Sequence, residues 1–150
     1  MWLEVPARTA AEAAQALGVQ VGQIAKSVVF RRLAGPGAAP AEDDGVVLVV
    51  ASGDRRVDEA SVAALAGALG RADAAFVKAR TGFSIGGVAP LAHATAPLTL
   101  VDRELLRFGL IWAAAGHPNG VFPLAPQDLL RLTEATLADV VVPPLLGEPR

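Results

Sequence analysis

The sequence has no cysteine among its 150 residues. This absence excludes disulfide bonds, a thiol nucleophile and thiolate metal ligands. Long apolar runs are also lacking, because the best candidate, residues 105–115, contains Arg107 and falls short of the roughly 20 apolar residues that span a bilayer. Glu4 and Pro6 stand where a signal peptide has its basic start and apolar stretch. We therefore expect a cytoplasmic protein without membrane contact.

Charged residues are few, at 19% of the chain, and the formal net charge is −2. This balance excludes the broad basic surface that is typical of nucleic-acid-binding domains. Basic residues occur in short pairs at Arg31-Arg32 and Arg55-Arg56, so any contact with RNA has to be local or brief. The length and the 53% hydrophobic content suit one domain over residues 1–150, with one core built mainly from small side chains, valine and leucine.

Capping patterns and apolar runs predict alternating helices and strands. Thr9 to Glu12 forms a capping-box pattern, and residues 46–51 form a continuous apolar run typical of a central strand. The glycines and prolines of residues 81–97 exclude a regular helix or a central strand there. We expect an α/β (α+β) fold with a mixed sheet covered by helices. The expected helices are residues 9–18, 58–69, 73–80 and 126–132; the expected strands are 27–33, 46–51, 98–101, 110–115, 120–124 and 137–142; residues 34–45 are an expected loop.

Lys26 precedes the first apolar strand, which begins at Ser27. A lysine at this point can present its ammonium inside a pocket at the strand edge, where it would bind a phosphate, a carboxylate or a carbonyl oxygen. The alternative is a lysine whose stem covers apolar surface while its head stays in water. The sequence position alone leaves both interpretations open.

Residues 82–86 match the G-x-S-x-G motif of serine hydrolases, and Asp102 and His117 follow Ser84 in the chain order of a catalytic triad. That motif requires a strand before the serine and a helix directly after it. Gly86, Gly87 and Pro90 exclude the helix, and residues 73–80 before the motif are predicted to be helical. A serine esterase is therefore the less favoured hypothesis.

Residues 86–90 support a different use of the same segment. Gly86 and Gly87 allow a close approach of the backbone to a ligand or a positive φ, and Pro90 stiffens the exit of the loop. Exposed carbonyls could hold an α-ammonium and exposed amides a carbonyl oxygen, although an ordinary surface loop would have the same composition. His93 closes this loop. His117 lies in an expected hairpin loop over residues 116–119, where it could orient a water, contact a ribose hydroxyl or face solvent.

Three segments in this order and spacing, residues 24–30, 81–90 and 115–122, resemble the YbaK/EbsC family. That family includes free-standing tRNA editing proteins and the editing insertion of bacterial prolyl-tRNA synthetases. The resemblance extends from about residue 9 to residue 142. It implies a mixed, strongly curved sheet surrounded by helices, no metal and no organic cofactor. It also implies hydrolysis of the ester of a mischarged tRNA, by analogy tRNA-Pro carrying alanine, serine, threonine or cysteine.

The resemblance assigns a role to each matching residue. Lys26 corresponds to the pocket lysine that deacylation requires, and His117 to a histidine at the pocket rim in some branches. Gly86 to Pro90, with Gly87, Val88 and Ala89 between them, correspond to the loop whose backbone positions the aminoacyl group. Ser27 stands where the alanine-removing branch has asparagine, so we count it as substrate-binding and leave the amino acid open. The implied partner is mischarged aminoacyl-tRNA, with a synthetase or elongation factor as a further candidate, and a non-catalytic binding module is the alternative function.

Overall fold

The computed structural model describes residues 1–4, 6–7, 9–33 and 45–143. The loop expected over residues 34–45 lies outside this part of the chain except for Gly45.

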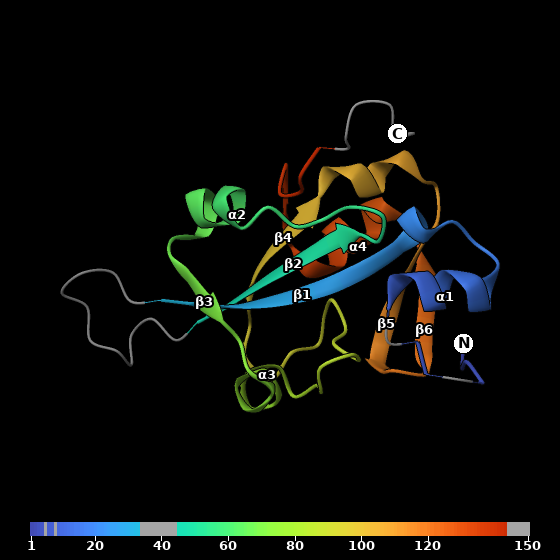
Figure 1. The fold of residues 1–150 in the computed structure, drawn as a ribbon, viewed down its shortest axis with the longest axis horizontal. Coiled ribbons are helices and arrows are strands. Elements are labelled where there is room, and N and C mark those ends of the chain that lie inside the picture. Colours follow the sequence, from blue (N-terminus) through green and yellow to red (C-terminus); the bar gives the residue numbers. More distant parts are fainter. Residues whose placement is uncertain (5, 8, 34–44, 144–150) are drawn as a thin grey trace.

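The described residues form one mixed sheet of seven strands (Figure 1). Its order is β6-β5-β1-β2-β4-β7, with β3 paired to β1. Strand β1 runs antiparallel to β2 and β3 and parallel to β5, while β4 runs parallel to both β2 and β7. The strands are β1 (Ile24–Arg32), β2 (Val46–Ser52), β3 (Leu69–Arg71), β4 (Leu98–Asp102), β5 (Ile111–His117), β6 (Gly120–Leu124) and β7 (Thr136–Ala138). The mixed α/β fold expected from the sequence is confirmed.

The first three α-helices begin directly after polar residues whose side chains cap them, whereas the fourth follows Ala125, which gives no side-chain cap, and has Pro126 as its first residue. Thr9 Oγ1 accepts the backbone N–H of Glu12 at 3.1 Å, and Gly18 ends the helix with a φ of 70°. Asp58 and Asp73 accept backbone N–H groups in the same way at the next two helices. The α-helices are α1 (Ala10–Leu17), α2 (Glu59–Ala66), α3 (Ala74–Thr81) and α4 (Pro126–Thr133), and two short 3-10 helices are η1 (Val21–Gln23) and η3 (Arg103–Arg107).

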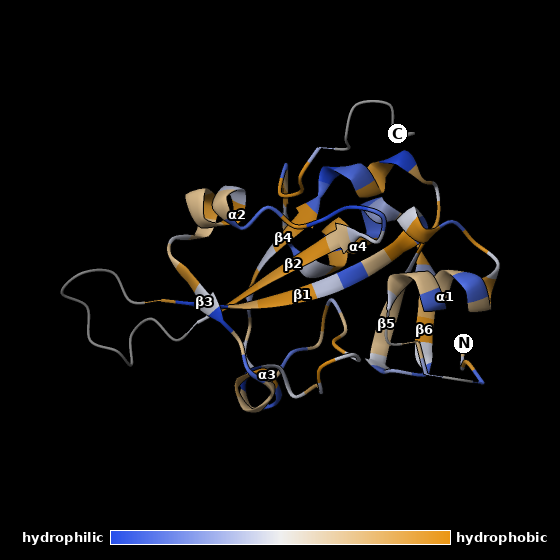
Figure 2. Cartoon of the chain, viewed as in Figure 1, coloured by the Kyte–Doolittle hydropathy of each residue, from blue (hydrophilic) through white to orange (hydrophobic). Residues whose placement is uncertain are grey.

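Strand β2 is the centre of the core, and all seven of its residues are buried. Figure 2 shows it as a continuously hydrophobic strand in the middle of the sheet. Leu48 and Val50 pack with buried residues of α3, η3 and α4 on one face, whereas Val47 and Val49 pack with Val62 of α2 on the other. Both faces are covered by apolar side chains, which explains why this strand is apolar throughout instead of alternating.

Four expected boundaries are wrong. The strand expected over residues 110–115 extends to His117, so this histidine ends β5 and residues 118–119 form the hairpin turn instead of the expected loop over residues 116–119. The second helix ends at Ala66 rather than near residue 69, because Gly67 takes a φ of 92°, and residues 69–71 form the unexpected strand β3. The last strand is residues 136–138 rather than 137–142, and Val141 makes an isolated bridge with Val57. The first strand begins at Ile24, so Lys26 lies inside it rather than before it.

Candidate functional site

A cavity lies where strands β1 and β5 stop pairing. The described residues of these strands pair at Ile24 with Trp112 and at Ala25 with Ala113, and at no further position. Strand β5 is then irregular before His117, where it turns into β6. The two backbones therefore separate, and helix α1 and the loop after α3 close the gap between them.

The cavity has a volume of about 140 Å³. A cavity of about 150 Å³ takes up a benzene-sized molecule, so this space suits a small amino-acid side chain. The space stays open because many of the side chains that line it are small. An alanine fills less volume than the leucine or valine found elsewhere in the core. Six alanines contribute to the lining: Ala7, Ala10, Ala13, Ala25, Ala113 and Ala114.

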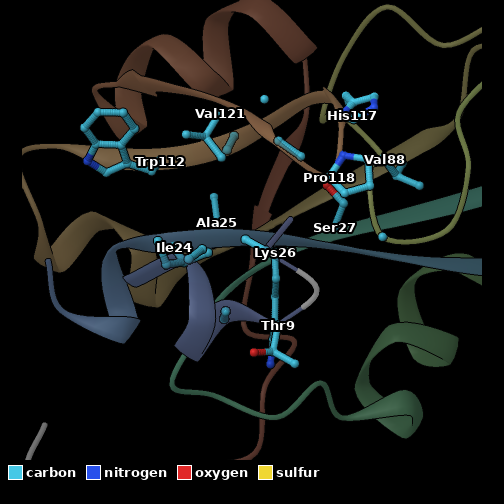
Figure 3. Close-up of a pocket in the computed structure, with 17 residues that line it drawn as sticks. Thr9, Ile24, Ala25, Lys26, Ser27, Val88, Trp112, His117, Pro118 and Val121 are labelled. Atoms are coloured by element: carbon cyan, nitrogen blue, oxygen red, sulfur yellow. The ribbon is translucent and has the colours of Figure 1, made fainter. Parts of the chain in front are cut away.

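Lys26 lines this cavity and is half-buried. Figure 3 shows it leaving β1 on the side of Thr9, while the next residue, Ser27, leaves on the side of Pro118. Its Nζ donates a hydrogen bond of 2.5 Å to the carbonyl oxygen of Arg55. An ammonium has three donors, and this is its single bond within the described residues, so two N–H groups remain for a ligand. The structure favours the pocket lysine over a lysine with its head in water.

Burial lowers the pKa of Lys26, and the negative charges of Asp102 and Asp54 oppose that shift. Asp102 is fully buried, and its two carboxylate oxygens accept the backbone N–H groups of Ser52 and Glu104 at 3.0 and 2.9 Å. Burial raises the pKa of Asp102 despite these two bonds. Burial therefore disfavours the charged form of Lys26, while the two carboxylates favour it.

Asp54 holds the turn that presents the Arg55 carbonyl to Lys26. Arg107 Nη2 lies 2.9 Å from Asp54 Oδ1, and Arg55 Nη1 lies 3.3 Å from Asp54 Oδ2. Burial alone would raise the pKa of Asp54, but hydrogen bonds from Arg107 and Ser52 and the charges of Arg107 and Arg55 outweigh it and lower that pKa. The Arg55 N–H closes the turn on the Ser52 carbonyl at 3.0 Å. This network fixes the acceptor that orients the ammonium.

Ser27 contributes a hydroxyl to the other side of the cavity. Its Oγ is buried and has no hydrogen-bond partner among the described residues. A buried polar atom without a partner is costly unless a water or ligand satisfies it. The geometry is therefore compatible with the expected substrate-binding role of Ser27.

The structure favours glycine at positions 86 and 87 for two different reasons. Gly86 has a φ of 92°, which residues with a side chain rarely adopt. A Cβ on Gly87 would lie 3.0 Å from Pro118 Cδ and 3.1 Å from His117 Cα, so this glycine lets the loop pack against the β5–β6 hairpin. The expected positive φ is found at Gly86, whereas the close approach at Gly87 is to the hairpin, and the expected approach of the backbone to a ligand stays a prediction.

The five expected loop residues differ in their position relative to the cavity. Gly86 and Val88 line it, together with His117. Gly87, Ala89 and Pro90 are buried and do not belong to its lining. Their expected roles stay predictions that concern the backbone of the loop rather than direct contact of each residue.

The two histidines have separate functions in the structure. His117 is exposed at the cavity, and its Nδ1 accepts the N–H of Asn119 at 3.0 Å, which places the proton of a neutral ring on Nε2. His93 lies outside the cavity lining, where its Nε2 is 2.6 Å from the Ala89 carbonyl and its ring meets the Phe83 ring edge-on at 5.3 Å. His93 therefore braces the loop.

The serine-hydrolase geometry is not formed. Ser84 follows helix α3 and lies exposed in a turn that Gly87 closes by donating to its carbonyl. Asp102 is occupied by backbone N–H groups, and Nδ1 of His117 by Asn119, so neither is bonded to the other within the described residues. The motif lacks both the preceding strand and the following helix that it requires.

The described residues contain no group of three or more His, Cys, Asp or Glu side chains placed to hold a metal ion. None of their helices has the length and apolar character needed to cross a membrane.

The fold and the cavity define a class of small α/β domain that can hold a compact group between two diverging strands. The model of the aminoacyl-tRNA editing domain family matches residues 4–132. The chain therefore belongs to this family. The uncharacterized protein YwhH of Bacillus subtilis (strain 168) is 34% identical over 127 residues, which cover 84% of this chain and 75% of that protein.

Solved structures show the same fold. One, described as a candidate trans-editing enzyme for prolyl tRNA synthetase, is 39% identical with a TM-score of 0.84, covering 95% of this chain and 85% of that one. Another, the protein APE2540, is 33% identical with a TM-score of 0.79, covering 95% of this chain and 89% of that one. Their similarity extends over nearly all of this chain.

Part of the site could not be found in the sequence. Trp112 and Ala113 become lining residues because β5 pairs in parallel with β1, and no local pattern predicts a pairing between strands so distant in the chain. The contact of Asp54 with Arg107 has the same origin. The alanines of α1 have no polar or reactive group that would mark them as site residues in the sequence. Lys26 and the glycine loop were recognised through the family resemblance, because the positions of these residues alone left both interpretations open.

Proposed function

We propose that this protein is a trans-editing aminoacyl-tRNA deacylase, with residues 1–150 as a single editing domain. The observation that carries the proposal is the position of the Lys26 ammonium beside a small, alanine-lined cavity in a member of the aminoacyl-tRNA editing domain family. We propose tRNA-Pro as the carrier, because a relative 39% identical is described as a candidate trans-editing enzyme for prolyl tRNA synthetase.

The reaction is hydrolysis of the ester between the amino acid and the terminal ribose. Water attacks the carbonyl carbon, the carbonyl oxygen takes up negative charge, and the ribose hydroxyl leaves as the C–O bond breaks and a proton returns to it. We assign Lys26 to this oxyanion, because two of its N–H groups have no partner within the described residues. An aminoacyl ester is already activated, so charge stabilisation and correct placement of the water supply most of what is needed.

The remaining groups hold the substrate. In this proposal the backbone at Gly86 and Val88 contacts the aminoacyl group, and the unpartnered Ser27 hydroxyl gives it one further hydrogen bond. His117 stands at the rim, where the terminal ribose and its hydroxyls would lie. A ribose hydroxyl beside the ester is an additional group that can orient the attacking water.

Selection follows from the size of the cavity. A space of about 140 Å³ admits the side chain of alanine, serine, threonine or cysteine and excludes side chains larger than a benzene-sized group. This is the second sieve of double-sieve editing, in which a small site removes what a larger synthetic site cannot reject. The small side chains that line the cavity support selection by size, but they do not identify which amino acid is removed.

A non-catalytic binding module is the second candidate. One observation favours it: the described residues that line the cavity include no carboxylate, and His117 is the one imidazole among them. A protein of this kind would bind the aminoacylated 3′ end and protect the ester rather than cleave it.

Release of amino acid from a panel of mischarged tRNAs distinguishes the two functions. Each tRNA, including tRNA-Pro charged with alanine, serine, threonine or cysteine, is incubated with the protein, and free amino acid is measured against spontaneous hydrolysis. The deacylase predicts rapid release of one or a few small residues and no release of proline. Protection of every ester by folded protein, with no release, would replace the deacylase by the binding module.

A further inference from the structure

An exposed aromatic platform lies at the mouth of the cavity. The Trp2 side chain is 65% exposed, and its ring stacks on the His117 ring with the centroids 4.7 Å apart and the planes tilted by 30°. His117 itself lines the cavity. One indole face is thus engaged by the histidine while much of the ring remains open to solvent.

The backbone fixes this platform in place. Trp2 pairs with Gly120 as an antiparallel bridge, so its segment extends the edge of the β5–β6 hairpin. The Leu3 N–H donates to the Asn119 carbonyl at 2.7 Å, and the side-chain amide of Asn119 donates to the Leu3 carbonyl at 2.9 Å. The indole is therefore held on the same hairpin tip that closes the cavity, rather than on a free end.

We propose that Trp2, stacked on His117, binds the terminal nucleobase of the RNA whose acyl group occupies the cavity. The inference rests on the proposed function, because it takes the ligand to be an aminoacyl ester of a terminal adenosine. In such an ester the acyl group and the base are attached to the same ribose. An acyl group placed beside Lys26 therefore brings its own base to the rim, where His117 and Trp2 stand.

Stacking suits both the ligand and this protein. A stacking contact between a base and an aromatic ring needs no positive charge on the protein, and the chain has a net charge of −2. Trp2 is consequently a binding residue for the RNA end, with no part in breaking the ester bond. Its loss should weaken binding without changing the rate of the bound substrate.

The test is binding of a labelled acceptor-stem RNA hairpin, compared between a 3′-terminal adenosine and an abasic residue at the same position. Wild type should bind the adenosine end about tenfold more tightly, the effect expected of one stacked base. Trp2→Ala should lose this preference, and Trp2→Phe should keep most of it because a smaller ring still stacks. Leu65→Ala, which removes an equally exposed apolar side chain on α2, is the matched control and should bind like wild type.

Two outcomes would overturn the proposal that Trp2 binds the terminal base. One is equal binding of both RNA ends by wild type, and the other is an unchanged preference of Trp2→Ala for the adenosine end. Deacylation is measured separately on the same preparations. A base preference that depends on Trp2, in a wild type that hydrolyses no ester, would retain the platform and reject the deacylase. Ester hydrolysis without any base preference would do the opposite.

Discussion

Lys26 is half-buried and held by a backbone carbonyl, so keeping its ammonium charged costs more than it would in water. Asp102 and Asp54 offset part of this cost. The two carboxylates favour the charged form of Lys26, and two of its N–H groups have no partner within the described residues. The ammonium is therefore well placed to stabilise new negative charge. The same features make its protonation state measurable.

The first prediction concerns pH. The pKa of Lys26 lies below its ordinary value of 10.5, so the ammonium is lost at a lower pH than in a free lysine. If the ammonium stabilises the oxyanion, the single-turnover rate should fall as the pH rises through this lowered pKa. The rate is measured after subtraction of spontaneous hydrolysis, and a ¹³Cε NMR titration of Lys26 locates the same transition.

Asp54→Asn provides the test of this assignment. The substitution removes a negative charge that raises the pKa of Lys26, so the alkaline fall should move to a lower pH. A fall at an unchanged pH, or at a pH unrelated to the NMR transition, would argue that another group controls the rate.

The second prediction concerns the stability that Asp54 provides. Its pKa is lower in the folded protein than in the unfolded chain, so its contribution is present at neutral pH and disappears as the pH falls through the folded value. Asp54→Asn should therefore have a lower Tm than wild type at pH 7, and the difference should shrink in acid. Thermal unfolding followed by circular dichroism between pH 7 and about pH 3 measures this.

Asp139→Asn is the matched control for that series. Asp139 pairs with Arg103 at 3.0 Å, but its side chain is 82% exposed, and surface ion pairs contribute little to stability. Its Tm should follow that of wild type at every pH. An equal loss of Tm in both variants would mean that the turn at Asp54 is not specially stabilised.

At the level of secondary structure, the loop after α3 and the β5–β6 hairpin form the site by packing against each other. Gly87 permits this contact, and Gly116, with a φ of 93°, lies where a Cβ would meet Phe83 Cε1 at 2.9 Å. Two glycines from distant segments therefore face the opposing element at close range. The His93 bond to Ala89 then holds the loop in that position.

The third prediction compares three glycine-to-alanine substitutions. Gly87→Ala introduces a Cβ against the His117 backbone, so we expect a loss of activity and a loss of about 1–3 kcal/mol in the free energy of unfolding. Gly86→Ala meets no atom within 4 Å but strains a φ of 92°, for which we expect a stability loss of about 1–2 kcal/mol. Urea unfolding and single-turnover deacylation measure both effects.

Gly109→Ala is the control, because its Cβ would meet nothing within 4 Å and it does not have the positive φ of Gly86. It should match wild type in both measurements. Full activity of Gly87→Ala would show that the contact between loop and hairpin is unimportant for the site.

The elements themselves differed in how well the sequence predicted them. Strand β2 was evident because an apolar run buried on both faces has no polar alternation to confuse it, and α1 was evident from the capping-box pattern that begins at Thr9. Strands β3 and β7 have three residues each, and their formation depends on partners elsewhere in the sheet. The sequence missed β3 and predicted β7 with the wrong bounds, as residues 137–142, since nothing in three residues specifies the neighbouring strand.

At the level of the whole molecule, the sheet order places β1 beside both β2 and β5. Strand β1 thereby brings Lys26 to the turn after β2 on one side and to the cavity against β5 on the other. This arrangement explains why a lysine in a strand can be both oriented and accessible. It could not be predicted from the sequence, because it depends on one parallel and one antiparallel pairing of the same strand.

The charge of the molecule limits how it meets its substrate. A net charge of −2 gives no long-range attraction to tRNA, so we propose that contact is confined to the acceptor end and that a synthetase or elongation factor assists delivery. Such contact agrees with a cavity that accepts the acyl group and with an aromatic side chain at its rim.

The most direct test of the central claim is single-turnover deacylation by Lys26→Ala. The variant is compared with wild type on the mischarged tRNA that wild type hydrolyses fastest, and its fold is verified by circular dichroism and thermal unfolding. Loss of one charged oxyanion donor should lower the rate by about 10²–10³-fold while the protein stays folded and still binds the RNA. A folded Lys26→Ala variant that releases amino acid at the wild-type rate would contradict the account.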